Sequence, residues 1–252
     1  MMPVLQQSQT QTSGQTSMTK LQVSGLNSQY GPAHILFDVA LEVGVGEVVA
    51  LLGRNGAGKS TTFRSIVGLV SQRSGQVMFD GEDVSALPTY EIVRRGLGYV
   101  PEDRRVFNQL TVEENFAVGR QKPRPGVATW TPEMLYELFP NLGEMRKRPG
   151  GQMSGGEQQM LTIGRTLMGN PSLVLLDEPS EGLAPKIVEQ MADAILAMKR
   201  QGLSIVISEQ NLHFAKLISD RAYIIEKGRI RFSGTMADLE ANPEIRDAYL
   251  AV

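Results

Sequence analysis

The sequence predicts an α/β fold, with a mixed or parallel sheet core and an inserted helical subdomain. Short runs that are apolar at every position, residues 48–52 and 173–176, alternate with stretches that carry their apolar residues at helical spacing. Continuously apolar strands are typical of a parallel sheet that helices cover on both faces. Residues 88–170 differ, because they contain mainly helical patterns and a Pro-rich loop. They predict a helical subdomain inserted into the sheet domain.

The first residues lack the composition of a folded core. Residues 6–17 consist almost entirely of Gln, Ser, Thr and Gly. Such side chains cannot offset the conformational entropy that ordering removes. We therefore predict a disordered tail over residues 1–18 and one folded domain over residues 19–252.

The first half of the folded domain alternates strands and a helix. Apolar stretches at residues 21–23 and 35–43 predict strands, the second with partial alternation. Residues 48–52 predict a buried strand that leads into a Gly-rich loop. A helix is expected from residue 61 to about residue 69.

The same order recurs in the second half. A strand at residues 173–176 precedes a helix from about 185 to 200, whose apolar residues fall on one face. Residues 203–207 predict another strand, followed by a helix from about 212 to 218. The Lys-Gly pair at 227–228 lies between two apolar runs, which indicates a β-hairpin.

Composition excludes several classes of function. The chain has 27 acidic and 25 basic residues, so no basic field indicates a nucleic-acid partner. It contains no cysteine, which excludes disulfides and thiolate metal sites. No run approaches the roughly 18 apolar residues that a membrane span needs, and the first residues do not resemble an export signal. We expect a soluble, unexported protein that reaches a membrane only through a partner.

The loop after the strand at 48–52 has the composition of a phosphate-binding loop. It fits the pattern G-x-x-x-x-G-K-[ST] between a predicted strand and a predicted helix. Glycines let consecutive backbone N–H groups face one anion, and the helix adds its positive N-terminal end. Lys59 is expected to reach the β- and γ-phosphates of a nucleotide, and Ser60 to ligate Mg²⁺. An ordinary Gly-rich turn does not require Lys-Ser after its last glycine. The predicted nucleotide-binding residues are Gly53, Arg54, Asn55, Gly56, Ala57, Gly58, Lys59, Ser60 and Thr61.

Two adjacent carboxylates follow the apolar strand at 173–176. Asp177 is expected to hold Mg²⁺, directly or through water, as a strand-borne Asp does in P-loop ATPases. Glu178 is placed to orient or deprotonate an attacking water. A solvated loop is the alternative, and the phosphate loop upstream favours the catalytic interpretation.

The segment Ser154-Gly155-Gly156-Glu157 also has two explanations. Ser followed three residues later by Glu forms a capping box at the start of a helix. A cap alone does not require Gly155 and Gly156, and each glycine inside a helix costs about 1 kcal/mol relative to alanine. We predict a cap that also serves as an anion site, since the positive helix end suits a phosphate.

These motifs together resemble the ABC ATPase family over nearly the whole chain from about residue 20 onward. The resemblance implies that Ser154, Gly155 and Gly156 contact the γ-phosphate of ATP bound by a second ATPase subunit, in a homo- or heterodimer. It also implies that Tyr30 stacks on adenine, although a tyrosine of the core or of a turn is the alternative.

Three positions depart from the common family pattern. Glu102 stands where, by the family resemblance, a glutamine usually links Mg²⁺ to the transporter contact, and its carboxylate is expected to ligate Mg²⁺ as well. Gln210 replaces the usual histidine, and it is expected to hydrogen-bond a γ-phosphate without an imidazolium charge. Ala184 replaces an expected aspartate. A weakened ATPase site is one interpretation of these three substitutions.

Their combination resembles one subfamily, the LivF-type ATP-binding subunits of branched-chain amino-acid importers. The matching motifs begin at Val100, Thr111, Tyr136, Met153, Glu181 and Glu209. The resemblance implies ATP hydrolysis, transmembrane permease partners, an indirect solute-binding protein and a position on the cytoplasmic face of the plasma membrane. A urea or short-amide importer, a soluble ABC switch protein and a kinase are the alternatives, and a kinase leaves residues 154–158 without a role.

Overall fold

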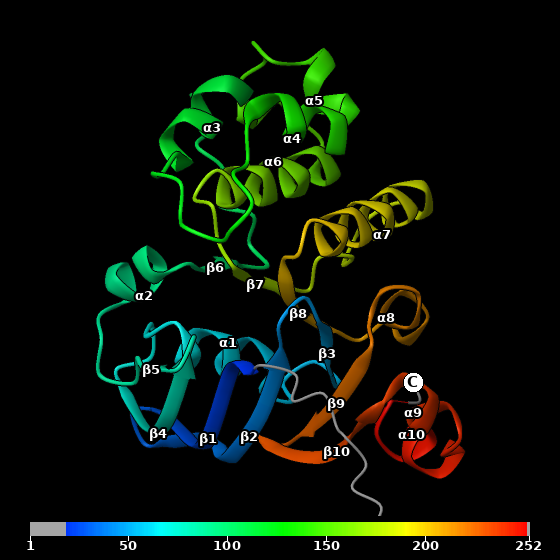
Figure 1. The fold of residues 1–252 in the computed structure, drawn as a ribbon. Coiled ribbons are helices and arrows are strands. Elements are labelled where there is room, and N and C mark those ends of the chain that lie inside the picture. The colour runs from blue at the N-terminus through cyan, green and yellow to red at the C-terminus, as the bar shows by residue number, and fades with distance from the viewer. Residues whose placement is uncertain (1–18, 251–252) are drawn as a thin grey trace, which may run out of the picture.

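The computed structural model describes residues 19–250, and the predicted tail over residues 1–18 lies outside that range. Figure 1 shows a helical layer at the top, a central sheet below it, and a second sheet at the base. This arrangement confirms the predicted α/β fold with a sheet core.

The central sheet has six strands in the order β10-β9-β3-β8-β7-β6. All neighbouring pairs are parallel except the β9–β10 hairpin, so the sheet is mixed. Its strands are β3 (Val48–Leu52), β6 (Leu97–Val100), β7 (Leu173–Asp177), β8 (Ser204–Glu209), β9 (Arg221–Glu226) and β10 (Arg229–Thr235). The hairpin turn has φ 48° at Lys227 and 72° at Gly228, as a two-residue type I′ turn requires.

The second sheet is antiparallel, in the order β2-β1-β4-β5. It contains β1 (Thr19–Tyr30), β2 (Ala33–Gly44), β4 (Gln72–Phe79) and β5 (Glu82–Asp83). Alternate residues of β1 and β2 are buried, and these apolar side chains face the central sheet. The long β1–β2 pair therefore closes one face of the core.

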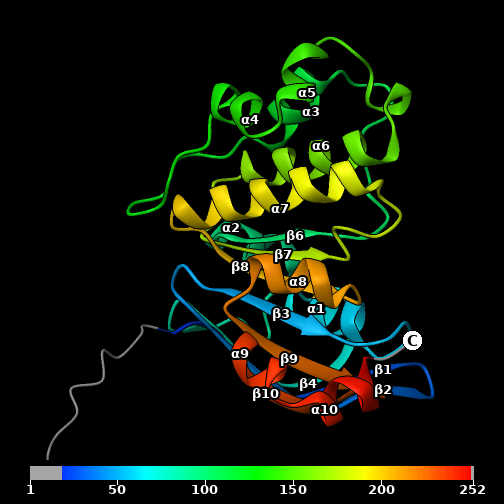
Figure 2. The same cartoon turned by 90° about the vertical axis from the view of Figure 1, so that its right-hand side faces the viewer.

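The central strands are buried on both faces, which explains their continuous apolar sequences. Along β3, Val49 and Leu51 pack with the antiparallel sheet and with α1 (Lys59–Ile66), while Val48, Ala50 and Leu52 join the opposite core. That opposite core contains residues of α7 (Pro185–Arg200) and α8 (Leu212–Ile218). Both helices lie in front of the central strands in Figure 2. Their bounds match the predicted helices.

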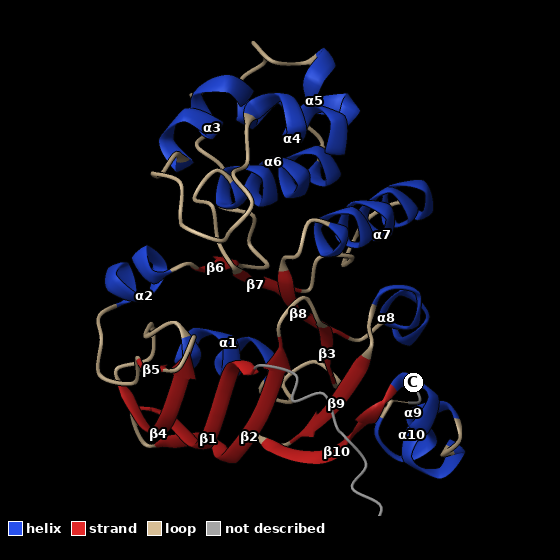
Figure 3. Cartoon of the chain, viewed as in Figure 1, coloured by secondary structure: helices blue, strands red, loops and turns tan. Residues whose placement is uncertain are grey.

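A separate layer of helices lies above the central sheet, coloured blue in Figure 3. Its members are α3 (Val112–Gly119), α4 (Pro132–Leu138), α5 (Pro140–Glu144), the short η1 (Gly150–Gln152) and α6 (Gly155–Leu167). Gly164 permits close packing of α6 on α3, because an added Cβ there would lie 2.6 Å from the Phe116 ring.

The helical layer begins later than the predicted boundary at residue 88. Helix α2 (Thr89–Arg95) leads into β6, which pairs in parallel with β7 as the edge strand of the central sheet. The chain therefore enters the helical layer only after Val100, the last residue of β6. The four-residue strand contains Gly98, so its apolar run is too short to identify as a strand from sequence.

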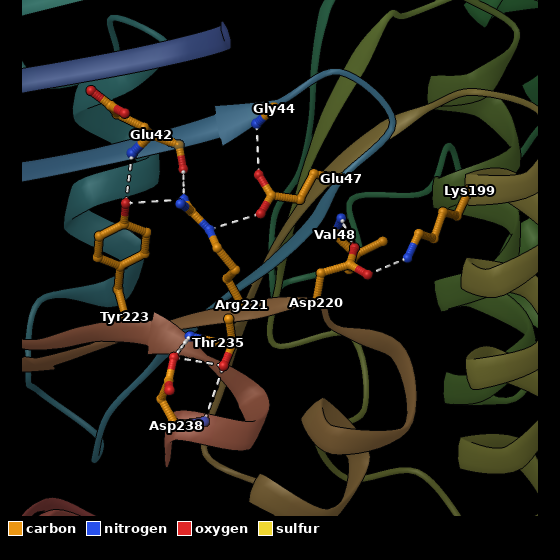
Figure 4. A network of polar contacts seen from close by, with 10 residues as sticks. All are labelled: Glu42, Gly44, Glu47, Val48, Lys199, Asp220, Arg221, Tyr223, Thr235 and Asp238. Carbon is orange, nitrogen blue, oxygen red and sulfur yellow. Dashed lines mark hydrogen bonds and ion pairs between the residues drawn. The ribbon is translucent and has the colours of Figure 1, made fainter. Parts of the chain in front are cut away.

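A polar network connects the two sheets at the start of β9 (Figure 4). Arg221 pairs with Glu47 at 2.8 Å and donates to the carbonyl oxygen of Glu42 on β2 at 2.8 Å. The Tyr223 hydroxyl accepts from the Glu42 N–H at 3.0 Å. These contacts fix β9 against β2. The last helices of the described residues are α9 (Met236–Glu240) and α10 (Pro243–Tyr249).

Candidate functional site

The Gly-rich loop joins β3 to α1, and two of its positions require glycine for structural reasons. An added Cβ at Gly53 would lie 2.5 Å from the carbonyl oxygen of Ile225 on β9. Gly58 has φ 113° and immediately precedes α1. The hairpin turn also supports the loop, since the Gly228 N–H donates to the Ala57 carbonyl at 2.8 Å. Packing against the hairpin thus fixes the shape of the loop.

Lys59 is buried at the first position of α1 and points back into the loop. Its Nζ donates to the carbonyl oxygens of Gly53 at 2.7 Å and Arg54 at 3.1 Å. It also pairs with Glu178 Oε1 at 2.9 Å, and both side chains are almost fully buried. The structure therefore brings together the loop lysine and the second carboxylate after β7.

Asp177 is fully buried and accepts three hydrogen bonds. Ser60 Oγ and Ser208 Oγ donate to Oδ1 at 3.0 and 2.6 Å, and the Tyr99 hydroxyl donates to Oδ2 at 3.1 Å. Burial and the Asp177 charge raise the pKa of Tyr99 above its usual value, so this hydroxyl remains a donor. The carboxylate is held from α1, β6 and β8 at once.

Glu178 has φ 50°, in the left-handed region that few non-glycine residues adopt. Its backbone N–H donates to Ser208 Oγ at 3.0 Å, which stabilises this turn. Gln210 Nε2 donates to Glu178 Oε2 at 3.4 Å. The two predicted catalytic side chains, from the ends of β7 and β8, therefore lie side by side.

A pocket of 390 Å³ opens beside the loop. It is lined by Tyr30, Ile35, Asn55, Gly56, Gly58, Lys59, Ser60, Thr61, Glu102 and Glu178. Tyr30 is 45% exposed. An aromatic face, the loop and Glu102 thus border one cavity.

Residues 154–156 lie outside the pocket beside the Gly-rich loop, at the start of α6. The predicted capping box is present: the Glu157 N–H donates to Ser154 Oγ at 3.4 Å, and the Ser154 N–H donates to Glu157 Oε2 at 2.7 Å. Within residues 19–250, the lining of the pocket beside the Gly-rich loop includes none of Ser154, Gly155 and Gly156.

The close approach to these glycines comes from the chain itself. An added Cβ at Gly156 would lie 2.8 Å from Cγ2 of Ile187 on α7. One at Gly155 would meet the guanidinium of Arg104, which also donates to the Glu181 carbonyl at 3.4 Å. Packing against Ile187 therefore accounts for Gly156 without a phosphate, a cause that the sequence did not reveal, whereas a side chain at Gly155 would meet only the flexible end of Arg104.

Three residues of the site were absent from the sequence prediction, namely Tyr99, Ser208 and Glu209. Ser208 and Glu209 end β8, which pairs in parallel with β7. Polar residues at the carboxyl end of a buried parallel strand were the signal that identified Asp177. The same signal was available for these two residues.

The oxygen groups around the loop fit a magnesium ion. Ser60 Oγ and Asp177 Oδ1 are hard ligands 3.0 Å apart, and Glu102 borders the same pocket. In the described part of the chain, no group of three or more His, Cys, Asp or Glu side chains is placed to hold a metal. The pair formed by Ser60 and Asp177 suits Mg²⁺, because one or two protein ligands often hold this ion together with substrate phosphates.

Comparison with known proteins gives concordant results. The ABC transporter family model matches residues 36–181. The chain is 46% identical to the high-affinity branched-chain amino acid transport ATP-binding protein BraG of Pseudomonas aeruginosa, over 89% of this chain and 97% of that protein. It is 38% identical to the probable branched-chain amino acid transport ATP-binding protein LivF of Archaeoglobus fulgidus, over 85% and 91%.

Other similarities extend to a different transport system and to a solved structure. The lipopolysaccharide export system ATP-binding protein LptB of Haemophilus influenzae is 36% identical, over 92% of this chain and 98% of that protein. An ATP-binding cassette of an ABC transporter, solved in its ADP conformation, has a TM-score of 0.77 and 25% identity, over 91% and 98% of the two chains.

Proposed function

Because the chain belongs to the ABC transporter family of ATP-binding proteins, we propose that it hydrolyses ATP as the peripheral subunit of an importer for branched-chain or other hydrophobic amino acids. One observation carries the ATPase assignment. Beside the Gly-rich loop, which has the pattern of a phosphate-binding loop, the structure brings together the side chains of Lys59, Asp177, Glu178 and Gln210. The importer assignment is supported by the 46% identity to BraG, which exceeds the 36% identity to LptB. A urea or short-amide importer is the second candidate for the solute.

The phosphates of ATP lie on the loop from Gly53 to Ser60, where backbone N–H groups and the N-terminus of α1 face them. Lys59 reaches the β- and γ-phosphates by exchanging its Glu178 contact, 2.9 Å long here, for phosphate oxygens. This exchange releases Glu178 Oε1, so substrate binding itself uncovers the base. Tyr30 stacks on the adenine ring at the open side of the pocket.

Hydrolysis then uses the two side chains at the ends of β7 and β8. Glu178 orients and deprotonates the attacking water, while Gln210 donates to Glu178 or to the γ-phosphate from its amide nitrogen. Ser60, Asp177 and Glu102 would hold Mg²⁺, and the ion would neutralise charge that develops on the phosphates. Asp177 keeps its orientation through its three donors.

The working assembly contains further chains. ATP-binding subunits of this family act with transmembrane permease components, and no helix within residues 19–250 is long and apolar enough to cross a bilayer. We propose a second ATPase subunit, and the γ-phosphate of the ATP bound to that subunit faces Ser154, Gly155 and Gly156. Both subunits lie on the cytoplasmic face of the membrane. A solute-binding protein acts indirectly, through the permease.

Two measurements test this function. Glu178→Gln should abolish turnover while ATP binding, followed with a fluorescent ATP analogue, stays at the wild-type level. Near-normal hydrolysis by this variant would remove Glu178 from its role. In proteoliposomes that hold the purified transporter complex, leucine should stimulate ATPase activity. Stimulation by urea alone would overturn the amino-acid assignment.

A further inference from the structure

Glu209 is a buried carboxylate that the proposed mechanism does not yet use. It is the last residue of β8, directly before Gln210, and only 1% of its surface is exposed. A charged side chain is seldom buried to this degree unless hydrogen bonds compensate for the lost hydration. Its contacts therefore indicate what the burial achieves.

The side chain of Glu209 joins two loops. Oε1 accepts the N–H of Ser180 at 3.0 Å, and Oε2 accepts the N–H of Asn211 at 3.4 Å. Ser180 lies two residues after Glu178, and Asn211 directly follows Gln210. The backbone also contributes, since the Glu209 carbonyl accepts the N–H of Gly53 at 3.2 Å. One residue thus contacts the loops that carry the candidate base, its glutamine partner and the phosphates.

The alignment of Glu178 with Gln210 needs such a connection. Their own contact is a single hydrogen bond of 3.4 Å, and they directly follow two different strands, β7 and β8. Small displacements of catalytic groups reduce turnover strongly, so the spacing between the two loops has to be fixed. Glu209 spans the backbone of both loops from the buried side.

We propose that Glu209 is a positioning residue for ATP hydrolysis, whose carboxylate sets the distance between Glu178 and Gln210 by bridging the Ser180 and Asn211 N–H groups. This inference rests on the proposed role of Glu178. Glu209 does not touch the nucleotide in this account. It acts through the two residues beside it.

The ionisation of Glu209 links this role to pH. Burial raises its pKa to about 7; the Ser180 hydrogen bonds lower it, and the nearby Glu178 charge raises it. Glu178, at the end of β7, is the charged group that acts on it, while Ser180 and Asn211 face it as neutral donors. Ionised Glu209 accepts both N–H groups, whereas a protonated oxygen is a poor acceptor. Turnover should therefore rise as the pH increases through about 7.

The test compares Glu209→Gln and Glu209→Ala with a matched control, Glu47→Gln. Glu47 also accepts a backbone N–H, from Gly44 at 2.6 Å, but lies beside Arg221 at the far end of β3. We would measure kcat, KM for ATP and fluorescent ATP-analogue binding at pH values roughly one unit either side of 7. Glu209→Gln keeps one acceptor and loses the other, while Glu209→Ala loses both.

We expect Glu209→Gln to lower kcat about tenfold, the loss of one charge-assisted hydrogen bond, with KM and binding unchanged. Its kcat should also lack the wild-type rise near pH 7, and Glu47→Gln should retain that rise. A Glu209→Gln enzyme with wild-type kcat and the same rise would overturn the proposal. Equal losses in ATP binding and kcat would also overturn it, because they indicate general disruption of the fold.

The Glu178→Gln variant separates this inference from the function on which it rests. If Glu178→Gln is inactive and Glu209→Gln behaves as wild type, the positioning role alone is wrong. If Glu178→Gln remains active, the assignment of the base is wrong and the inference fails with it. Glu209→Ala, should it fail to fold, is not needed, since the glutamine variant and its pH profile decide the outcome.

Discussion

Gly156 offers a direct test of why the start of α6 contains two glycines. A methyl group at Gly156 would lie 2.8 Å from Cγ2 of Ile187, a separation that Cβ atoms essentially never show. Ile187 is β-branched and lies in a helix, so its χ1 is largely restricted to one rotamer. Gly156→Ala therefore forces α6 and α7 apart.

The structure also sets the expected magnitude. Overpacking of this kind costs about 1–3 kcal/mol, and the better helix propensity of alanine returns about 1 kcal/mol. Gly156→Ala should then lower the free energy of unfolding by up to about 2 kcal/mol. Gly155→Ala is the matched control, because its methyl group meets only the flexible end of Arg104. That variant should be as stable as the wild type or slightly more stable.

Urea unfolding of a double-mutant cycle measures the contact. Ile187→Ala removes Cγ2, so it should relieve the effect of Gly156→Ala and give a coupling energy of about 1 kcal/mol or more. If Gly156→Ala and Gly155→Ala were equally stable, or if the two substitutions in the cycle were additive, packing would not explain Gly156. ATPase activity of Gly156→Ala/Ile187→Ala then isolates any contribution of the glycine to phosphate binding.

Three further outcomes are expected. Ser208→Ala should lower the free energy of unfolding by about 1–3 kcal/mol and reduce ATPase activity, because the buried hydroxyl donates to Asp177 and accepts from the Glu178 N–H. Urea unfolding and a phosphate-release assay measure the two effects, and unchanged values in both would contradict this reasoning. Glu102→Gln should raise permease-free ATPase activity, since it removes a negative charge that borders the pocket beside Glu178, and an equal or lower rate counts against that reason. The third outcome concerns how the free energy of unfolding depends on pH. The pKa of Glu209 is raised from 4.5 to about 7 in the folded state, so between these pH values the folded state retains a proton that the unfolded state has lost. Stability should fall by about 3 kcal/mol as pH rises from below 4.5 through about 7 and change little above it, whereas Glu209→Gln should lack this component in urea unfolding.

The sequence predicted best those elements whose local pattern agrees with their final environment. Residues 48–52 are apolar throughout, and the β3 strand is buried on both faces. Helices α7 and α8 begin and end at the predicted residues because their apolar faces lie on the core. Helix α1 begins at Lys59 instead of residue 61, because Gly58 at φ 113° ends the loop earlier than the motif suggests.

The elements that sequence missed depend on distant partners. Strand β4 is polar along much of its length, and its pairing with β1 supplies the missing local signal. Strand β6 pairs with β7, more than 70 residues later in the chain. Tyr99 enters the site only through that pairing, so no local pattern identifies it as a donor to Asp177.

The hairpin of β9 and β10 has a consequence for the order in which the protein is made. The Gly-rich loop is near the N-terminus, yet its shape depends on Ile225 and Gly228, which the ribosome adds late. Gly228 also accepts the N–H of Phe37 at 2.8 Å, so it joins β2 to the loop. During synthesis, the residues of the Gly-rich loop emerge long before the hairpin that shapes them. A nascent chain should therefore gain affinity for nucleotide only after residues 221–235 have left the exit tunnel, which delays nucleotide capture until the fold is nearly complete.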